Sequence, residues 1–127
     1  PMKTILTILL LAATTARANN YYLFTDTQKE VQDSVKKYNP ATWNFDFEKS
    51  TITVQTETED AIFTFSEYQK VESIEDGTVF DKFILDTGGA IYVDNDIQSK
   101  DFLQIIYCKD GKQFVFRTEN NLTTNKN

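Results

Sequence analysis

Apolar and polar residues alternate over residues 43–65, and this alternation is the feature that most constrains the fold. A β-strand turns successive side chains to opposite faces, so an apolar residue at every second position produces one apolar face. Polar connections at residues 48–50 and 57–60 separate the pattern into three short runs. We therefore predict three strands whose common apolar face is formed by Trp43, Phe45, Phe47, Ile52, Val54, Ala61, Phe63 and Phe65.

The same pattern continues toward the C-terminus. It predicts further strands at residues 66–74, 79–85, 90–93, 102–108 and 113–117, and a short first strand at residues 19–25. The run at 66–74 is expected to bend or bulge near residues 67–69. The run at 102–108 is the most apolar, which favours a central position or cover on both faces.

Glycine-containing turns separate several of these runs. Asp76-Gly77 predicts a two-residue hairpin turn, because such turns need positive φ angles at both central residues. Thr87-Gly88-Gly89 predicts a second tight turn, and Asp110-Gly111 a third. The regular spacing of these turns indicates strands that follow one another as antiparallel neighbours.

One helix is predicted, over Asp26 to Tyr38. Thr27 and Glu30 have the spacing of a capping box, and lysines near the C-terminal end suit the helix dipole. Val31, Val35 and Tyr38 recur at helical spacing as a narrow apolar stripe. The helix is expected to end at Asn39-Pro40, because the residue before proline avoids helical geometry.

Together these elements predict an all-β domain with one N-terminal helix, built as a small antiparallel up-and-down meander. Closure into a barrel removes exposed strand edges, so a barrel with the helix at one end is our first expectation. A β-sandwich and a curved open sheet covered by the helix are the alternatives. The secretion signal, the helix, Trp43 on the first long strand and the meander resemble the lipocalin-like barrels. The Gly-x-Trp signature of that family is absent at residues 40–43, so the resemblance assigns no binding residue.

The first 18 residues read as a signal peptide. Lys3 precedes the apolar run at residues 5–13, and Ala16-Arg17-Ala18 is a small-x-small cleavage site. The run is short for a bilayer span, which needs about 20 apolar residues. We expect cleavage after Ala18, a single domain at residues 19–118, a disordered polar tail at residues 119–127, and a secreted or periplasmic location.

Net charge and cysteine content restrict the possible partners. Removing residues 1–18 removes two of the 13 basic residues and none of the 19 acidic ones, which leaves a net charge of −8. This charge argues against nucleic acid or an anionic membrane surface as a partner. Cys108 is the only cysteine, so no internal disulfide is possible, and its apolar surroundings predict a buried, inert thiol. We expect a monomer.

The chain contains no histidine, which excludes Ser-His-Asp and Cys-His catalytic arrangements. The carboxylates near Asp46 and Glu48, and those around residues 57–60, are expected to be solvated surface charges. We therefore expect no enzymatic activity and no cofactor. Asp94, Asp96 and Gln98 have the spacing of a calcium loop, but Ser99 and Ile105 break the EF-hand pattern. The preferred interpretation is an acidic loop, and a weak calcium site remains the alternative.

The abundance of aromatic residues at alternating positions is the most suggestive functional feature. They are Trp43, Phe45, Phe47, Phe63, Phe65, Phe80, Phe83, Tyr92, Tyr107, Phe114 and Phe116. A small barrel fills its interior with side chains, whereas a slightly wider one keeps a ligand cavity. Alternation alone does not distinguish a packed core from a cavity, and the core is the favoured interpretation.

Two functions follow from these features. The first is binding of a small apolar or amphipathic ligand by the residues Trp43, Phe45, Phe63, Phe65 and Phe116. The second is a secreted protein-interaction module, an inhibitor or accessory subunit, that acts through its acidic surface. An internal void lined by aromatic residues would favour the first, and a solid interior with an exposed aromatic patch would favour the second.

Overall fold

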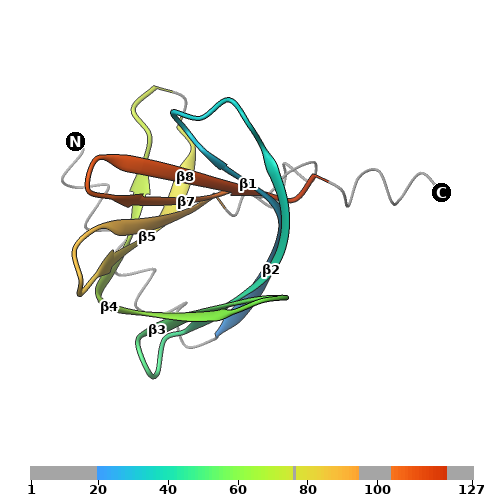
Figure 1. The fold of residues 1–127 in the computed structure, drawn as a ribbon. Helices are drawn as coiled ribbons and strands as arrows, with labels where there is room; N and C mark the ends of the chain where they lie inside the picture. The colour runs from blue at the N-terminus through green and yellow to red at the C-terminus, as the bar shows by residue number, and fades with distance from the viewer. Residues whose placement is uncertain (1–19, 76, 95–103, 120–127) are drawn as a thin grey trace.

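The computed structural model describes residues 20–75, 77–94 and 104–119. They form an all-β fold in which the strands follow one another around a closed barrel (Figure 1). The strands are β1 (Tyr21–Glu30), β2 (Lys37–Asp46), β3 (Thr51–Thr56), β4 (Asp60–Glu72), β5 (Val79–Leu85), β6 (Ala90–Asp94), β7 (Gln104–Lys109) and β8 (Lys112–Arg117).

Each strand pairs antiparallel with the next, and β1 also pairs with β8. The predicted up-and-down barrel is therefore confirmed, and the sandwich and the open sheet are wrong. The predicted bulge in β4 is also confirmed, because the β4–β5 register shifts between Phe65 and Glu67. In such a barrel the connections alternate between two ends. We call the end with connections 31–36, 57–59, 86–89 and 110–111 the open end, and the end with connections 47–50 and 73–78 the closed end.

The predicted helix over Asp26 to Tyr38 is wrong. The described residues contain no helix there, because β1 continues to Glu30 and β2 begins at Lys37. The apolar stripe that suggested a helix lies in solvent, since Val31 is 46% exposed and Val35 57% exposed. Thr27 of the predicted capping box and Asp26, the first residue of the predicted helix, have distant partners instead. The Thr27 hydroxyl donates to the Arg117 carbonyl, and Asp26 accepts a hydrogen bond from the Glu119 amide.

The turns are partly as predicted. Asp110 and Gly111 have φ angles of 53° and 79° between β7 and β8, as a two-residue hairpin turn requires. The hairpin between β4 and β5 is longer than predicted, because it closes on a hydrogen bond from the Ser73 amide to the Thr78 carbonyl. Gly89 is required in the β5–β6 turn. Its φ is 97°, and a Cβ atom there would lie 2.5 Å from the Cys108 carbonyl oxygen.

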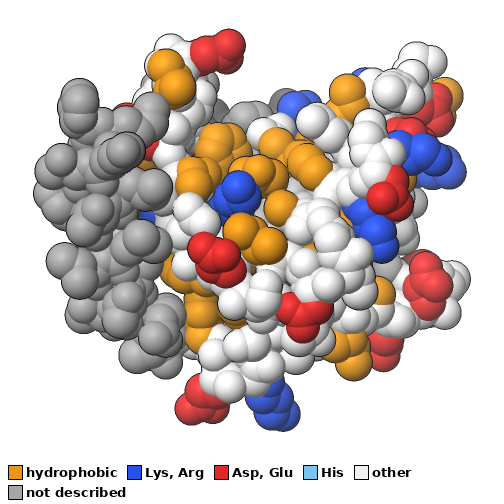
Figure 2. All heavy atoms as spheres, turned by 90° about the vertical axis from the view of Figure 1, so that its left-hand side faces the viewer, with side chains coloured by type: hydrophobic (Ala, Val, Ile, Leu, Met, Phe, Trp, Pro, Cys, Tyr) orange, Lys and Arg blue, Asp and Glu red, His pale blue; other side chains and the backbone are white. Residues whose placement is uncertain are grey.

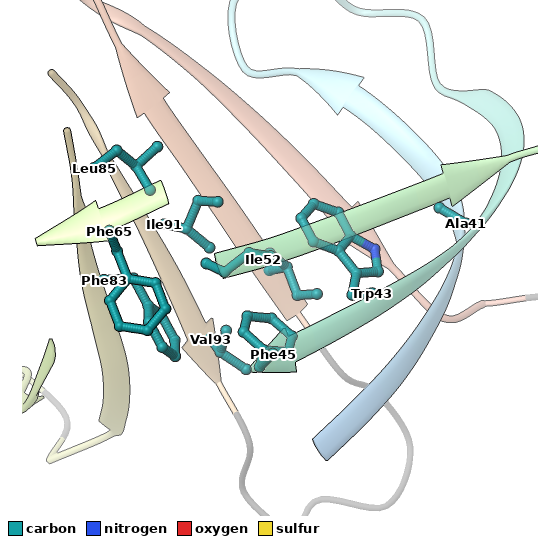
Figure 3. Close-up of a cluster of buried hydrophobic side chains, with 10 residues drawn as sticks. Ala41, Trp43, Phe45, Ile52, Phe65, Phe83, Leu85, Ile91 and Val93 are labelled. Atoms are coloured by element: carbon teal, nitrogen blue, oxygen red, sulfur yellow. The ribbon is translucent and has the colours of Figure 1, made fainter. Parts of the chain in front are cut away.

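The core consists of side chains that point into the barrel from alternate positions of the strands (Figure 3). The buried hydrophobic residues are Ala41, Trp43, Phe45, Ile52, Phe65, Phe83, Leu85, Ile91, Val93 and Ile105. β7 is not covered on both faces, contrary to expectation, since only Ile105 is fully buried among its residues. A strand of a small barrel has one face in the core and one outside, so no strand is central.

Several predictions lie outside the described residues. These are the signal peptide at residues 1–18, most of the tail at residues 119–127, and the Asp96 and Gln98 part of the candidate calcium loop. Within the described residues, no helix is long and apolar enough to cross a membrane.

Candidate functional site

The interior of the barrel is filled at the closed end. Phe47 follows the last residue of β2 and lies among the rings of Tyr21, Phe65, Tyr68 and Phe83, with centroid distances of 5.0 to 6.1 Å. Tyr21 also stacks on Phe45, with a centroid distance of 4.6 Å. Aromatic pairs at such distances stabilise a core beyond simple area burial. We call this group of packed rings, formed by described residues, the aromatic plug.

A buried carboxylate lies beside this plug. Asp81 on β5 is 5% exposed and accepts hydrogen bonds from the Tyr21 hydroxyl at 3.1 Å and the Tyr68 hydroxyl at 2.8 Å. The Lys70 ammonium group lies 2.7 Å from the same carboxylate and forms an ion pair with it. Burial, and then the negative charge of Asp81, raise the pKa of Tyr21 and of Tyr68 well above the usual range. Both phenols therefore remain hydrogen-bond donors, and the carboxylate is satisfied.

Sequence reasoning did not identify this group, although the sequence contains a signal for it. Asp81 stands two residues before Phe83 and four before Leu85, so its side chain points into the barrel as theirs do. An acidic residue at an inward position must find donors inside the barrel. Because all its donors are structural neighbours from the closed end, we assign this cluster to stability.

The open end contains a cavity of about 260 Å³. Its walls come from strands β1, β2, β3, β4, β7 and β8. The lining residues are Gln28, Asn39, Ala41, Trp43, Val54, Thr56, Glu59, Ala61, Phe63, Tyr107, Phe114 and Phe116. Most are apolar, and the polar ones lie near the connections that border the mouth. A concave apolar site with a few polar groups is the usual form of a small-molecule site.

Trp43 forms the inner wall of the cavity and is held firmly. Its indole N–H donates to the Thr25 hydroxyl at 2.9 Å, and both residues are buried. The ring of Phe116 meets the indole edge to face, with centroids 5.0 Å apart. Phe45, a member of the packed core, also stacks on the indole, with a centroid distance of 6.4 Å. The indole therefore separates the cavity from the packed part of the barrel.

Two strands show why space remains at one end only. Their successive inward positions are Ala41, Trp43 and Phe45 on β2, and Ala61, Phe63 and Phe65 on β4. In both strands alanine stands nearest the open end and phenylalanine nearest the closed end. Small side chains at the mouth leave the volume that the larger rings fill deeper in the barrel.

The five predicted site residues are divided by this arrangement. Trp43, Phe63 and Phe116 line the cavity. Phe45 and Phe65 are 0% and 6% exposed members of the packed core, and they do not line it. Alternation predicts the face of a strand but not the depth along the barrel, so it could not separate the two groups.

The structure adds cavity residues that sequence reasoning missed. Gln28 falls within the predicted helix and Asn39 at its predicted end, yet their side chains meet between β1 and β2. The Asn39 amide donates to the Gln28 side-chain oxygen at 2.9 Å. Glu59, assigned to surface charge, lies at the rim. Its turn is held by hydrogen bonds with Thr56, in which the Glu59 carbonyl accepts from the Thr56 amide at 2.9 Å and hydroxyl at 3.0 Å.

Two residues of the predicted aromatic face lie outside the barrel. Phe83 on β5 and Val93 on β6 point into the barrel. Phe80 and Tyr92 occupy the other set of alternate positions on these strands, so they point outward. Their rings meet edge to face on the outer surface, and the Lys82 ammonium group lies 5.5 Å from the centre of the Tyr92 ring. Figure 2 shows a face on which hydrophobic side chains gather around one basic side chain.

Two further candidate sites are a metal site formed by acidic residues and the thiol of Cys108. Within the described part of the chain, no three His, Cys, Asp or Glu residues are grouped as metal ligands. Asp94 is 8% exposed, but Asp96 and Gln98 lie outside that part, so the calcium site remains a prediction. Cys108 is half-buried rather than fully buried, and burial raises the pKa of its thiol, which disfavours the reactive thiolate.

Comparison of the chain with protein-family models, curated proteins and solved structures gave no match. The geometry of the cavity is therefore the main indication of function. A closed antiparallel barrel of this kind is compatible with binding of a small ligand.

Proposed function

We propose that this protein is a secreted or periplasmic, non-enzymatic barrel that binds a small apolar or amphipathic ligand in the open-end cavity. The cavity lined by Trp43, Phe63 and Phe116 is the observation that supports this function most. The enclosing strands close on one another, so the site is largely preformed. Preformed sites save the ordering cost that a flexible site incurs on binding.

The cavity volume limits the size of the ligand. About 260 Å³ lies below the range of about 300–1,000 Å³ that drug-sized ligands occupy. Among the described residues, the rings of the aromatic plug pack against one another at the closed end, so we place the ligand in the open-end cavity. The proposed ligand is therefore a small ring system or a short chain, with its apolar part against Trp43 and its polar part near Gln28, Asn39 or Glu59.

The test is native mass spectrometry of the protein purified gently from its own secretory route, before and after denaturation. We expect an adduct that is lost on denaturation. Ala61→Phe places a ring in the cavity mouth and should abolish the adduct. Ile62→Phe is the matched control, because Ile62 lies on the outer face of the same strand and is 69% exposed. An adduct that survives Ala61→Phe, or that is absent from the unmodified protein across several preparations, would contradict the proposal.

A second candidate function is a protein-interaction module. Aromatic side chains on the outer face of β1 and β2 favour it, since Tyr22 is 68%, Phe24 45% and Tyr38 66% exposed. Exposed aromatic residues are common at partner surfaces. A pull-down with a Tyr22→Ser, Phe24→Ser variant as control would test it. Recovery of the same proteins by the variant would exclude this surface.

A further inference from the structure

Several aromatic rings line the open-end cavity. Five of its lining residues carry rings: Trp43, Phe63, Tyr107, Phe114 and Phe116. The ring centroids of Phe63 and Phe114 lie 5.3 Å and 6.1 Å from that of Tyr107, and those of Trp43 and Phe116 lie 5.0 Å apart. The face of an aromatic ring carries negative electrostatic potential, and it attracts cations that come within about 6 Å of its centroid.

Among the described residues that line this cavity, the charged one is Glu59. Glu59 stands at the rim, on the short connection between β3 and β4. The hydrogen bonds with Thr56 fix the backbone of this connection, so the position of the acidic residue is defined before a ligand arrives. Lys70, which points inward from β4 at the closed end, is paired with Asp81.

The surroundings of the mouth are also acidic. The four open-end connections, all within the described residues, contain five acidic residues and one basic residue: Asp33, Glu57, Glu59, Asp86 and Asp110, and Lys36. Lys36 forms an ion pair with Glu119. With the bordering strand residues Glu30, Lys37, Asp60, Lys109 and Lys112 included, the end remains net negative. Such a field raises the local concentration of cations and repels anions.

From these three observations we infer that the ligand is a small organic cation, a protonated amine or quaternary ammonium group attached to an apolar body. This inference rests on the proposed ligand-binding function. The apolar body lies against Trp43 and Phe116, and the cationic group lies toward Phe63, Tyr107 and the carboxylate of Glu59. Fatty acids and other anionic amphiphiles are disfavoured, because their carboxylate would meet Glu59 and the ring faces.

Three probes of matched size test the ligand class: 2-phenylethylamine, 2-phenylethanol and 3-phenylpropionate. Trp43 is the single tryptophan, so its fluorescence reports directly on the cavity. Isothermal titration calorimetry provides an independent binding constant. At neutral pH and low salt, we expect the ammonium probe to bind about tenfold more tightly than the alcohol, and the carboxylate to bind most weakly.

Glu59→Gln removes the negative charge and keeps the shape. It should weaken binding of the ammonium probe about three- to tenfold and leave binding of the alcohol unchanged. Glu57→Gln is the control, because Glu57 belongs to the same connection but does not line the cavity. Its binding constants should equal those of the unmodified protein, apart from a small loss of long-range attraction at low salt.

The outcomes distinguish the preference for a cationic ligand from ligand binding itself. Equal binding of the ammonium and alcohol probes would overturn the cation inference and support ligand binding itself. Stronger binding of the carboxylate would overturn the inference in the same way. Failure of all three probes to bind a folded protein would contradict both the inference and the proposed function. A preference for the ammonium probe that Glu59→Gln does not change would remove Glu59 from the site.

Discussion

The two ends of the barrel are built from the same alternating strands, yet the described side chains pack ring against ring at one end and border a cavity at the other. At the closed end, Phe47 completes a group of touching rings, and the buried Asp81 has three donors. At the open end, Ala41 and Ala61 occupy the corresponding inward positions near the mouth. On β2 and on β4, an alanine at the mouth lies four residues before a buried phenylalanine. The comparison indicates that the small size of this one residue per strand leaves the cavity open, so that neighbouring aromatic side chains line a cavity instead of packing in the core.

The largest expected difference between the two ends concerns ring truncation. Phe45→Ala removes a fully buried ring and should lower the free energy of unfolding by about 3–5 kcal/mol. Phe63→Ala removes a half-buried ring that already borders empty space, and it should cost about 1–2 kcal/mol. Urea denaturation of both variants measures the difference. Equal losses would mean that the open end is packed as tightly as the closed end.

A second difference concerns polar groups in the interior. Asp81→Asn removes the negative charge that pairs with Lys70 and accepts hydrogen bonds from two tyrosine hydroxyls. It should lower the free energy of unfolding by about 2–3 kcal/mol. The loss is smaller than for a fully buried ion pair, because the Lys70 side chain is 30% exposed and can turn toward solvent. Asp86→Asn, in an exposed turn, is the control and should change stability little.

Thermal denaturation followed by circular dichroism measures both Asp81→Asn and its control. If Asp81→Asn retained the full stability of the protein, the carboxylate would not anchor the closed end. Its role would then have to be sought in ligand binding.

The smallest effect is a pH dependence confined to the closed end. The pKa values of Tyr21 and Tyr68 are raised in the folded protein, so the folded state holds these protons more tightly than the unfolded state. Their contribution to stability is therefore complete below the unfolded tyrosine pKa of about 10 and is lost as the pH rises above it. The slope is at most about 1.4 kcal/mol per pH unit for each tyrosine.

Tyr21→Phe should reduce this loss above pH 10, because the variant has no phenol to ionise there. Tyr22→Phe is the matched control, since Tyr22 is an exposed neighbour on β1. Urea denaturation between pH 8 and 11 provides the comparison. Identical slopes for both variants would show that the Tyr21 phenol does not stabilise the closed end through Asp81.

Much of the fold was predictable from the sequence, because the barrel is specified by short-range alternation and by turns. The apolar parity of residues 43–65 and the Asp110-Gly111 turn required no knowledge of distant contacts. The segment at residues 26–38 was not predictable in this way. Its capping residues and apolar spacing are equally compatible with a helix, and its strand state depends on pairing of β1 with β8. The contacts that decide it, such as that of Thr27 with Arg117, join residues 90 positions apart.

The candidate site was predictable only in part, for a related reason. Parity placed Trp43, Phe63 and Phe116 inside the barrel, but it placed Phe45 and Phe65 there too. Depth along the axis depends on the stagger between neighbouring strands, which the sequence of one strand does not contain. Gln28 and Asn39 were missed because the wrong helix removed them from consideration. Glu59 was missed because the local sequence does not distinguish an acidic turn residue at the mouth of a cavity from one elsewhere on the surface.

The most direct test of the difference between the ends is a methyl NMR spectrum of the protein under xenon pressure, because xenon enters empty apolar cavities. We expect shifts for the methyl groups of Ala41, Val54 and Ala61, which line the cavity. The methyl groups of Val93, which lies opposite Asp81 in the β5–β6 register, should not shift. Shifts at Val93, or the absence of shifts at the three cavity residues, would contradict the claim that the rings are packed at one end and that the other end is a binding site.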